Sequence, residues 1–255
     1  MSVHPALRST VALLAVLVGL AVAIPLLVLT LWAGMPWWPV PILAIGVGVV
    51  TAGVLVQGSL DRVIESFGPL APTDDERLSN LVEGLSLSLG LDEPELFVIA
   101  DKGANAAAVA DGDRSMLIVT DRLLGELDRM CMEGVVAELL VRIKDGDAVV
   151  ATQVAGILAP RMEGPLAPVL GGIARKAMAD ALDTDRDLLA DQAAAAATRY
   201  PPGLAAALAT IDKLGARTSA TNRQNDHLWI APSLGDEAVI PHVPLEWRVD
   251  MLLEI

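Results

Sequence analysis

Charge is nearly absent from the first sixty residues, which contain one charged side chain, Arg8, before Asp61. Residues 11–32 are an unbroken run of 22 uncharged, mostly apolar residues. A helix of that length spans the hydrocarbon core of a bilayer, which is about 30 Å thick. A second apolar run, residues 40–58, is also long enough to cross. We therefore predict a two-helix transmembrane hairpin over residues 1–60, with spans at 11–32 and 40–58.

The basic residues that flank these runs predict the orientation of the hairpin. Arg8 precedes the first run, Arg62 and Arg77 follow the second, and the segment between the runs is uncharged. The positive-inside rule then places residues 61–255 in the cytoplasm, and the single cysteine, Cys131, fits a reducing compartment. We expect an integral protein of a prokaryotic plasma membrane. A cleaved signal peptide is the competing interpretation, but the first run exceeds the roughly 7–15 apolar residues of such peptides.

The second part of the chain, residues 61–255, is strongly acidic. It carries all 32 acidic and 17 of the 18 basic side chains, so its net charge is 17 − 32 = −15. This excess argues against electrostatic binding of nucleic acid. One cysteine excludes an internal disulfide and a cysteine-based metal cage, and we assign Cys131 a packing role. The chain also lacks a Walker A loop, a GxGxxG turn and a GxSxG elbow.

Hydrophobic periodicity predicts a mainly helical domain with a small β-sheet. Thr73 and Glu76 form a capping-box pattern before leucines at helical spacing, and that helix is expected to end at Gly90. Residues 95–100 and 115–120 are short β-type runs, which we predict to be neighbouring strands. More helices are expected from Asp128 as N-cap, over the short apolar run 148–159, around 193–197, and after Pro202 and Pro244.

The apolar run 148–159 is too short for a third full span. We predict a buried helix there. The alternative is that the stretch 148–179 dips into the membrane.

Residues 123–147, LLGELDRMCMEGVVAELLVRIKDGD, resemble the segment that carries the HExxH motif in HtpX-like membrane zinc metallopeptidases, relatives of the CAAX prenyl protease. Three further segments are similar to family patterns in the same order: residues 77–99, 186–208, and 227–235 with 241–249. With the hairpin, the resemblance covers nearly the whole chain. It implies a zincin-like α+β metallopeptidase domain over residues 61–255.

The residues of the family's zinc site are not present at the matching positions. In that family two histidines and a later carboxylate bind zinc, and the Glu after the first histidine is the general base. Glu138 and Arg142 stand at the two histidine positions here, and Leu139 stands at the position of the base. Asp187 replaces the liganding Glu, and Asp191 matches the Asp behind it. The resemblance therefore implies no catalytic residue, no metal and no cofactor.

Other histidines do not replace the missing ligands. Sliding the alignment by one places Glu138 at the position of the base but puts Ala137 and Val141 at the histidine positions. His227 and His242 match family histidines that do not bind zinc, and we expect both to be structural.

The positions of the former metal site predict a cluster of opposite charges. Glu138 and Arg142 are one helical turn apart, and buried carboxylates need a compensating cation. We hypothesise that Arg142 also reaches Asp187, with Asp191 nearby, so that this cluster occupies the metal position. The alternative is a surface pair of Glu138 and Arg142, worth about 0.2–0.5 kcal/mol, with Asp187 pointing elsewhere.

A second departure from the family concerns peptide binding. An N-A-F-x-x-G segment leads to the family's edge strand, and Asn105 and Ala106 match it, while Ala107 and Ala108 stand where the aromatic residue would be. Edge-strand pairing uses backbone groups, so peptide binding does not require the aromatic ring. The alternative is that this loop only connects two strands.

These observations favour a membrane-anchored, catalytically inactive homologue that acts as a binding or regulatory module for a protein or peptide partner. One alternative is an active metalloendopeptidase that holds zinc with Glu138, Asp187 and an unmatched histidine. A second alternative is a purely structural membrane scaffold without a peptide groove.

Overall fold

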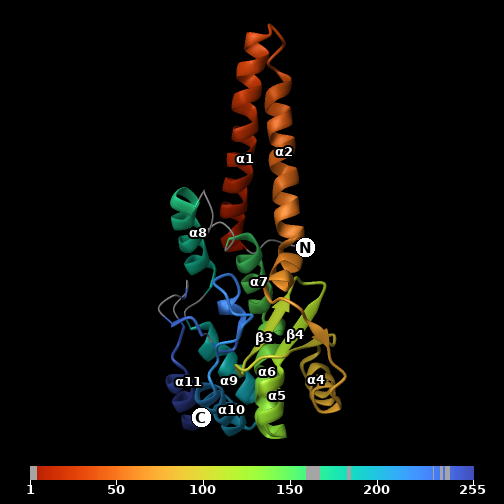
Figure 1. Cartoon of the computed structure of the whole chain (residues 1–255), viewed down its shortest axis with the longest axis vertical. Helices are drawn as coiled ribbons and strands as arrows, with labels where there is room; N and C mark the ends of the chain where they lie inside the picture. The colour runs from red at the N-terminus through yellow and green to blue at the C-terminus, as the bar shows by residue number, and fades with distance from the viewer. Residues whose placement is uncertain (1–4, 159–166, 183–184, 232, 236–237, 239–241) are drawn as a thin grey trace.

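The computed structural model of the chain describes residues 5–158, 167–182, 185–231, 233–235, 238 and 242–255. Two long helices, α1 (Pro5–Trp32) and α2 (Pro39–Gln57), lie side by side and project from the body formed by the later elements (Figure 1). Helix α8 (Ala167–Ala181) stands beside the lower part of α1. The C-terminal helix lies at the opposite end of the body from the hairpin tip.

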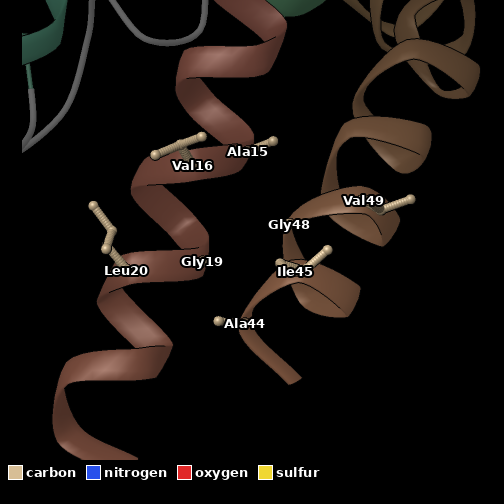
Figure 2. A pocket seen from close by; sticks show the side chains of 8 residues that line it. All are labelled: Ala15, Val16, Gly19, Leu20, Ala44, Ile45, Gly48 and Val49. Carbon is tan, nitrogen blue, oxygen red and sulfur yellow. The ribbon is translucent and has the colours of Figure 1, made fainter. Parts of the chain in front are cut away.

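Small residues allow α1 and α2 to approach closely. A Cβ atom added to Gly19 would lie 2.9 Å from the Ala44 carbonyl oxygen, and one added to Gly48 would lie 2.8 Å from that of Ala15. Larger side chains at these two positions would push the helices apart. Beside the crossing lies an apolar cavity of about 280 Å³, lined by these small residues and by Val16, Leu20, Ile45 and Val49 (Figure 2).

Within the described part of the chain, no single helix has both the length and the hydropathy needed to cross a bilayer. Residues Pro39–Val54 followed by Ser59–Ser66 (α3), with a bend of 46° between them, meet both criteria only when taken together. The spans at 11–32 and 40–58 therefore stay a prediction.

In the described part of the chain, the sheet has four strands in the order β1-β2-β4-β3. Strands β2 (Glu95–Ile99) and β4 (Ser115–Thr120) are parallel neighbours, which confirms the two strands predicted from the sequence. Strand β1 (Ala71–Pro72) pairs with β2, and β3 (Ala106–Ala110) pairs antiparallel with β4.

Strand β3 is buried on both faces, which explains why its sequence shows no alternation of apolar and polar residues. Ala106, Ala108 and Ala110 pack in one hydrophobic cluster with α4 (Glu76–Leu89) and α6 (Arg129–Lys144). Ala107 and Val109 pack in a second cluster with α3 and α7 (Asp147–Ile157). A strand between two cores reads as a continuous apolar run.

The helices around the sheet match the predicted pattern with one correction. The helix predicted to start with a Thr73 capping box is α4 (Glu76–Leu89), but its N-cap is Asp75, whose Oδ1 accepts a hydrogen bond from Leu78 N at 2.9 Å. The Thr73 hydroxyl instead accepts one from Asp75 N. Gly90 ends the helix in the left-handed region, as expected.

Asp128 caps α6 as predicted, because its Oδ1 accepts a hydrogen bond from Cys131 N at 2.9 Å. Residues 148–157 belong to a buried helix, as expected, while residue 159 lies outside the described part. The remaining helices are α5 (Asp121–Glu126), α6 (Arg129–Lys144), α7 (Asp147–Ile157), α9 (Arg186–Thr198), α10 (Pro201–Leu214), the 3₁₀ turn η2 (Asp226–Leu228) and α11 (Leu245–Glu254).

Candidate functional site

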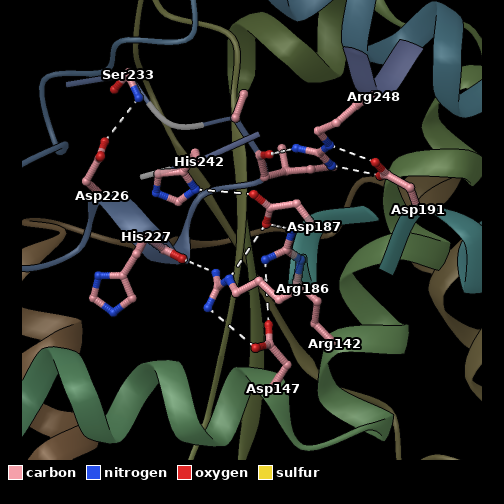
Figure 3. Close-up of polar contacts among 12 residues, drawn as sticks. Arg142, Asp147, Arg186, Asp187, Asp191, Asp226, His227, Ser233, His242 and Arg248 are labelled. Atoms are coloured by element: carbon pink, nitrogen blue, oxygen red, sulfur yellow. Dashed lines mark hydrogen bonds and ion pairs between the residues drawn. The ribbon is translucent and has the colours of Figure 1, made fainter. Parts of the chain in front are cut away.

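Helices α6 and α9 pack together and bring Glu138, Arg142 and Asp187 into contact. Figure 3 shows Arg142 beside Asp187. The Arg142 guanidinium lies between the carboxylates: its Nη2 is 2.5 Å from Glu138 Oε1 and 2.9 Å from Asp187 Oδ1. The three side chains are buried, with exposed fractions of 2% for Arg142, 0% for Glu138 and 3% for Asp187. The geometry is therefore that of an enclosed cluster and not of a surface pair.

The structure adds a second arginine from the end of the chain. Arg248 on α11 donates two hydrogen bonds to Asp191, with Nε 2.7 Å from Oδ2 and Nη2 2.8 Å from Oδ1. The same guanidinium lies 3.5 Å from Glu138 Oε1 and donates to the Ile230 carbonyl oxygen. Bidentate contacts of this kind fix the guanidinium plane. Arg248 thus joins α11 to α9 and to the centre of α6.

A third arginine, Arg186, extends the cluster toward α7. Its Nη1 is 3.4 Å from Asp147 Oδ1, and its Nη2 donates a hydrogen bond to the His227 carbonyl oxygen. Asp147 also lies 3.6 Å from Arg142 Nη1. Sequence reasoning did not include Arg186, Asp147 or Arg248 in the site. The available signal was charge balance, because one arginine cannot compensate three buried carboxylates.

The arginines favour the ionised form of Asp187 but not that of Glu138. Burial opposes ionisation of Asp187, but the Arg142 guanidinium and a hydrogen bond from His242 outweigh it, and the pKa of Asp187 falls well below its usual range. For Glu138, burial dominates and raises the pKa, and Arg142 and Arg248 offset this only in part. Among the residues that the structure describes, Glu138 Oε2 is buried without a hydrogen-bond partner.

The residues at this position do not fit a zinc ion. Zinc takes neutral imidazole, thiolate or carboxylate ligands in tetrahedral geometry. A guanidinium has no lone pair to donate and stays charged, so Arg142 is not a ligand. It also lies against the oxygens of Glu138 and Asp187 that would face an ion. Throughout the described residues, no group of three or more His, Cys, Asp or Glu side chains is arranged to hold a metal.

His242 and His227 have different partners. His242 places Nδ1 3.3 Å from Asp187 Oδ2. His227 is buried, and its Nε2 is 3.0 Å from the Ala151 carbonyl oxygen, which fits a neutral ring that donates from Nε2.

Because His227 is buried as a neutral ring, we predict that the free energy of unfolding falls in mild acid. Burial, together with the nearby Arg186 cation, lowers its pKa to about 3. The folded state therefore keeps the ring neutral, while the unfolded chain binds a proton below about pH 6.5. The contribution of neutral His227 to the free energy of unfolding is fully present above that pH. It is lost as the pH drops, by roughly 1 kcal/mol per pH unit between about pH 6 and 4. Denaturant unfolding at a series of pH values measures the slope.

The His227→Gln variant is the control for this prediction, because glutamine keeps a donor for Ala151 but does not titrate. We expect the variant to have a shallower slope over this pH range. Equal slopes in both proteins would assign the acid sensitivity to other groups.

The predicted peptide-binding edge is covered where it begins. Ile230 N donates a hydrogen bond to the Ala106 carbonyl oxygen at 2.7 Å, and Trp229 forms an antiparallel bridge with Ala107. The Asn105 side-chain amide donates to the carbonyl oxygen of Ala231 at 2.6 Å. An extended peptide would have to displace the fully buried Trp229 to reach these backbone groups. Residues 105–108 are all buried, so the edge is not open in this structure.

The fold and the site together define a mainly helical α+β protein with a small mixed sheet and a buried ionic centre between α6 and α9. The chain belongs to the HtpX-like metallopeptidase family. It is 30% identical over 251 residues to "Protease HtpX homolog" of Dictyoglomus turgidum, and the match covers 81% of each chain. It is 28% identical over 245 residues to the homolog of Tropheryma whipplei, covering 84% of each chain. No family model and no solved structure matches the chain.

Proposed function

We propose that this chain is a membrane-anchored, catalytically inactive member of its family that serves as a binding or regulatory module. The Arg142 guanidinium carries the proposal, because it contacts the carboxylates of Glu138 and Asp187 where an active member would hold its ion. Leu139, at the position of the general base, has no group that can accept a proton from water. An active enzyme with unusual ligands would need Arg142 to leave both carboxylates.

Zinc content tests this proposal directly. Elemental mass spectrometry of the detergent-purified full chain is expected to find far less than one equivalent of zinc, with the same value in an Asp187→Ala variant. Proteolysis of casein, with and without a chelator, provides an independent readout and is expected to show no chelator-sensitive cleavage. Near one equivalent of zinc, lost in the Asp187→Ala variant, would mean that the chain should be treated as a protease.

We infer that α1 and α2 anchor the chain in a membrane, with the body on the cytoplasmic side. The hairpin supports this because it has no charged side chain between Arg8 and Asp61, and because large apolar side chains on it are exposed. Exposed apolar surfaces of this extent mark interaction with lipid or protein. The exposed tryptophans at the end of α1 and in the connecting segment suit a membrane interface; they are Trp32, Trp37 and Trp38.

A cysteine-labelling experiment tests this orientation. In a Cys131→Ser background, a cysteine at the exposed position 92 (Asp92→Cys) is expected to react with a membrane-impermeant maleimide in inside-out vesicles but not in intact cells. Labelling of intact cells would place the body outside, and recovery of the protein in the supernatant after alkaline extraction would refute the anchor.

The covered start of β3 favours a binding surface elsewhere on the body. Trp229 packs edge-on against Phe67, with ring centroids 5.2 Å apart, and its side chain is fully buried. Removing a side chain of this size from a core costs about 3–5 kcal/mol, a large part of the stability of an ordinary domain. A partner peptide would have to supply that energy before it gained any contact with β3.

A further inference from the structure

The orientation of α11 is fixed by its inner face. Arg248 is fully buried and bound to Asp191 and to the Ile230 carbonyl oxygen, and Leu252, one turn later, packs in the main hydrophobic cluster. Residues four apart on a helix share a face. The helix cannot rotate about its axis without breaking the buried ion pair. Its exposed side is therefore held in solvent. This outer face runs around the helix from Glu246 through Asp250, Glu254 and Trp247 to Met251.

That outer face carries large apolar side chains. Trp247 is 66% exposed and Met251, one turn later, is 40% exposed; Leu253 and Ile255 are exposed as well. Trp and Met are enriched at protein–protein interfaces, and Trp is frequent among the residues that dominate binding energy. These side chains contribute little to folding where they are, because each keeps much of its surface in water.

The same face is acidic. Glu246, Asp250 and Glu254 are exposed along α11, while its single basic residue, Arg248, points inward. The carbonyl end of a helix carries a partial negative charge, so acidic side chains in the last turn are unfavourable there. Asp250 and Glu254 add to that negative end. A cation placed against this turn would be attracted both by the helix end and by these two carboxylates.

We propose that the outer face of α11 is a docking site for a basic amphipathic helix of a partner protein. Apolar residues of the partner at helical spacing would cover Trp247 and Met251, and its Lys or Arg side chains would pair with the acidic row. The face lies at the end of the body away from the hairpin, where a soluble partner has access if the hairpin is in a membrane (Figure 1). A second copy fits less well, because symmetric pairing would bring two acidic rows together.

This proposal names the partner class of the proposed binding role and rests on it. Peptide binding tests it without reference to zinc. The full chain is placed in phosphatidylcholine nanodiscs, and the anisotropy of a labelled leucine–lysine amphipathic helix is measured against empty nanodiscs. A leucine–glutamate helix is the charge control. The variants are Trp247→Ser/Met251→Ser and Glu246→Lys/Asp250→Lys, and Leu87→Ser, which alters an 82% exposed leucine on α4, is the matched control.

We expect the leucine–lysine helix to bind the wild type and the Leu87→Ser control equally. Both double variants should weaken binding by more than about tenfold, as loss of a central anchor does at other interfaces. The altered side chains are exposed, and thermal unfolding checks that the variants fold. Equal binding to all variants would overturn the proposal. A dimer in light scattering that is lost in Trp247→Ser/Met251→Ser would also overturn it, in favour of a second copy.

The two proposals can fail separately. A full equivalent of zinc would end the inactive-homologue proposal even if the peptide binds α11. Absence of peptide binding in a zinc-free protein would end only the docking proposal.

Discussion

Replacement of Arg142 with alanine is expected to lower the free energy of unfolding by about 3–5 kcal/mol, the typical cost of removing one partner from a buried ion pair. The guanidinium contacts Glu138 and Asp187, both of which are buried. Without it, two carboxylates face each other across a space that water does not fill freely. Denaturant unfolding at neutral pH in a fixed detergent measures the change.

Two comparisons separate this effect from a general loss of packing. Arg122 and Glu126 form an exposed helical pair four residues apart, at 3.3 Å, so Arg122→Ala should cost less than about 1 kcal/mol. The triple variant Glu138→Gln, Arg142→Met, Asp187→Asn removes all three charges and should recover part of the loss. A cost for Arg142→Ala as small as that of Arg122→Ala would refute the buried cluster.

Restoring the family motif should create a zinc site. In the variant with Glu138→His, Leu139→Glu, Arg142→His and Asp187→Glu, we expect close to one equivalent of zinc where the parent chain binds almost none. Positions 138 and 142 lie on one face of α6 and both face position 187 on α9. Zinc would supply positive charge where the guanidinium was removed, and the new histidines would bind at about 2.0–2.1 Å.

Elemental analysis and X-ray absorption spectroscopy measure the content and the ligand distances of this variant. The Leu139→Glu variant alone is the control and should stay free of zinc, because Arg142 still occupies the position. Absence of zinc in a well-folded quadruple variant would show that these positions do not correspond to the ligands of active relatives. Cleavage of casein is measured separately, because Trp229 still covers the start of β3 and a zinc-loaded variant could lack access for a peptide substrate.

Local patterns predicted the parts of the site that depend on one helix. The pair of Glu138 and Arg142 follows from helical spacing alone, and the contact with Asp187 followed from the family resemblance. Arg248 and Arg186 were missed because their contacts join segments far apart in the chain. The spacing of residues within one helix cannot predict contacts between distant segments. Only the need to balance buried charge indicates that such contacts exist.

The errors in the fold have similarly specific causes. Hydrophobic periodicity missed strand β3, because alanines between two cores carry no alternation and little β-propensity. Only the family resemblance indicated an edge strand near residues 105–108. Thr73 and Asp75 are both good capping residues two positions apart, and only the hydrogen bond to Leu78 decides between them. The membrane spans rest on the length and apolar character of residues 11–32 and 40–58, and they stay a prediction.

The inward guanidinium of α11 has a consequence for how the outer face communicates with the interior. Arg248 bonds to Asp191 and to the Ile230 carbonyl oxygen while its helix presents Trp247 to solvent. A molecule that binds α11 only while Arg248 is bound to Asp191 must stabilise the ion cluster by mass action. By reciprocity, a change that weakens the cluster must lower the affinity of the outer face of α11 for that molecule. The stability of the buried ion cluster would then set the affinity of the outer face of α11 for its partner.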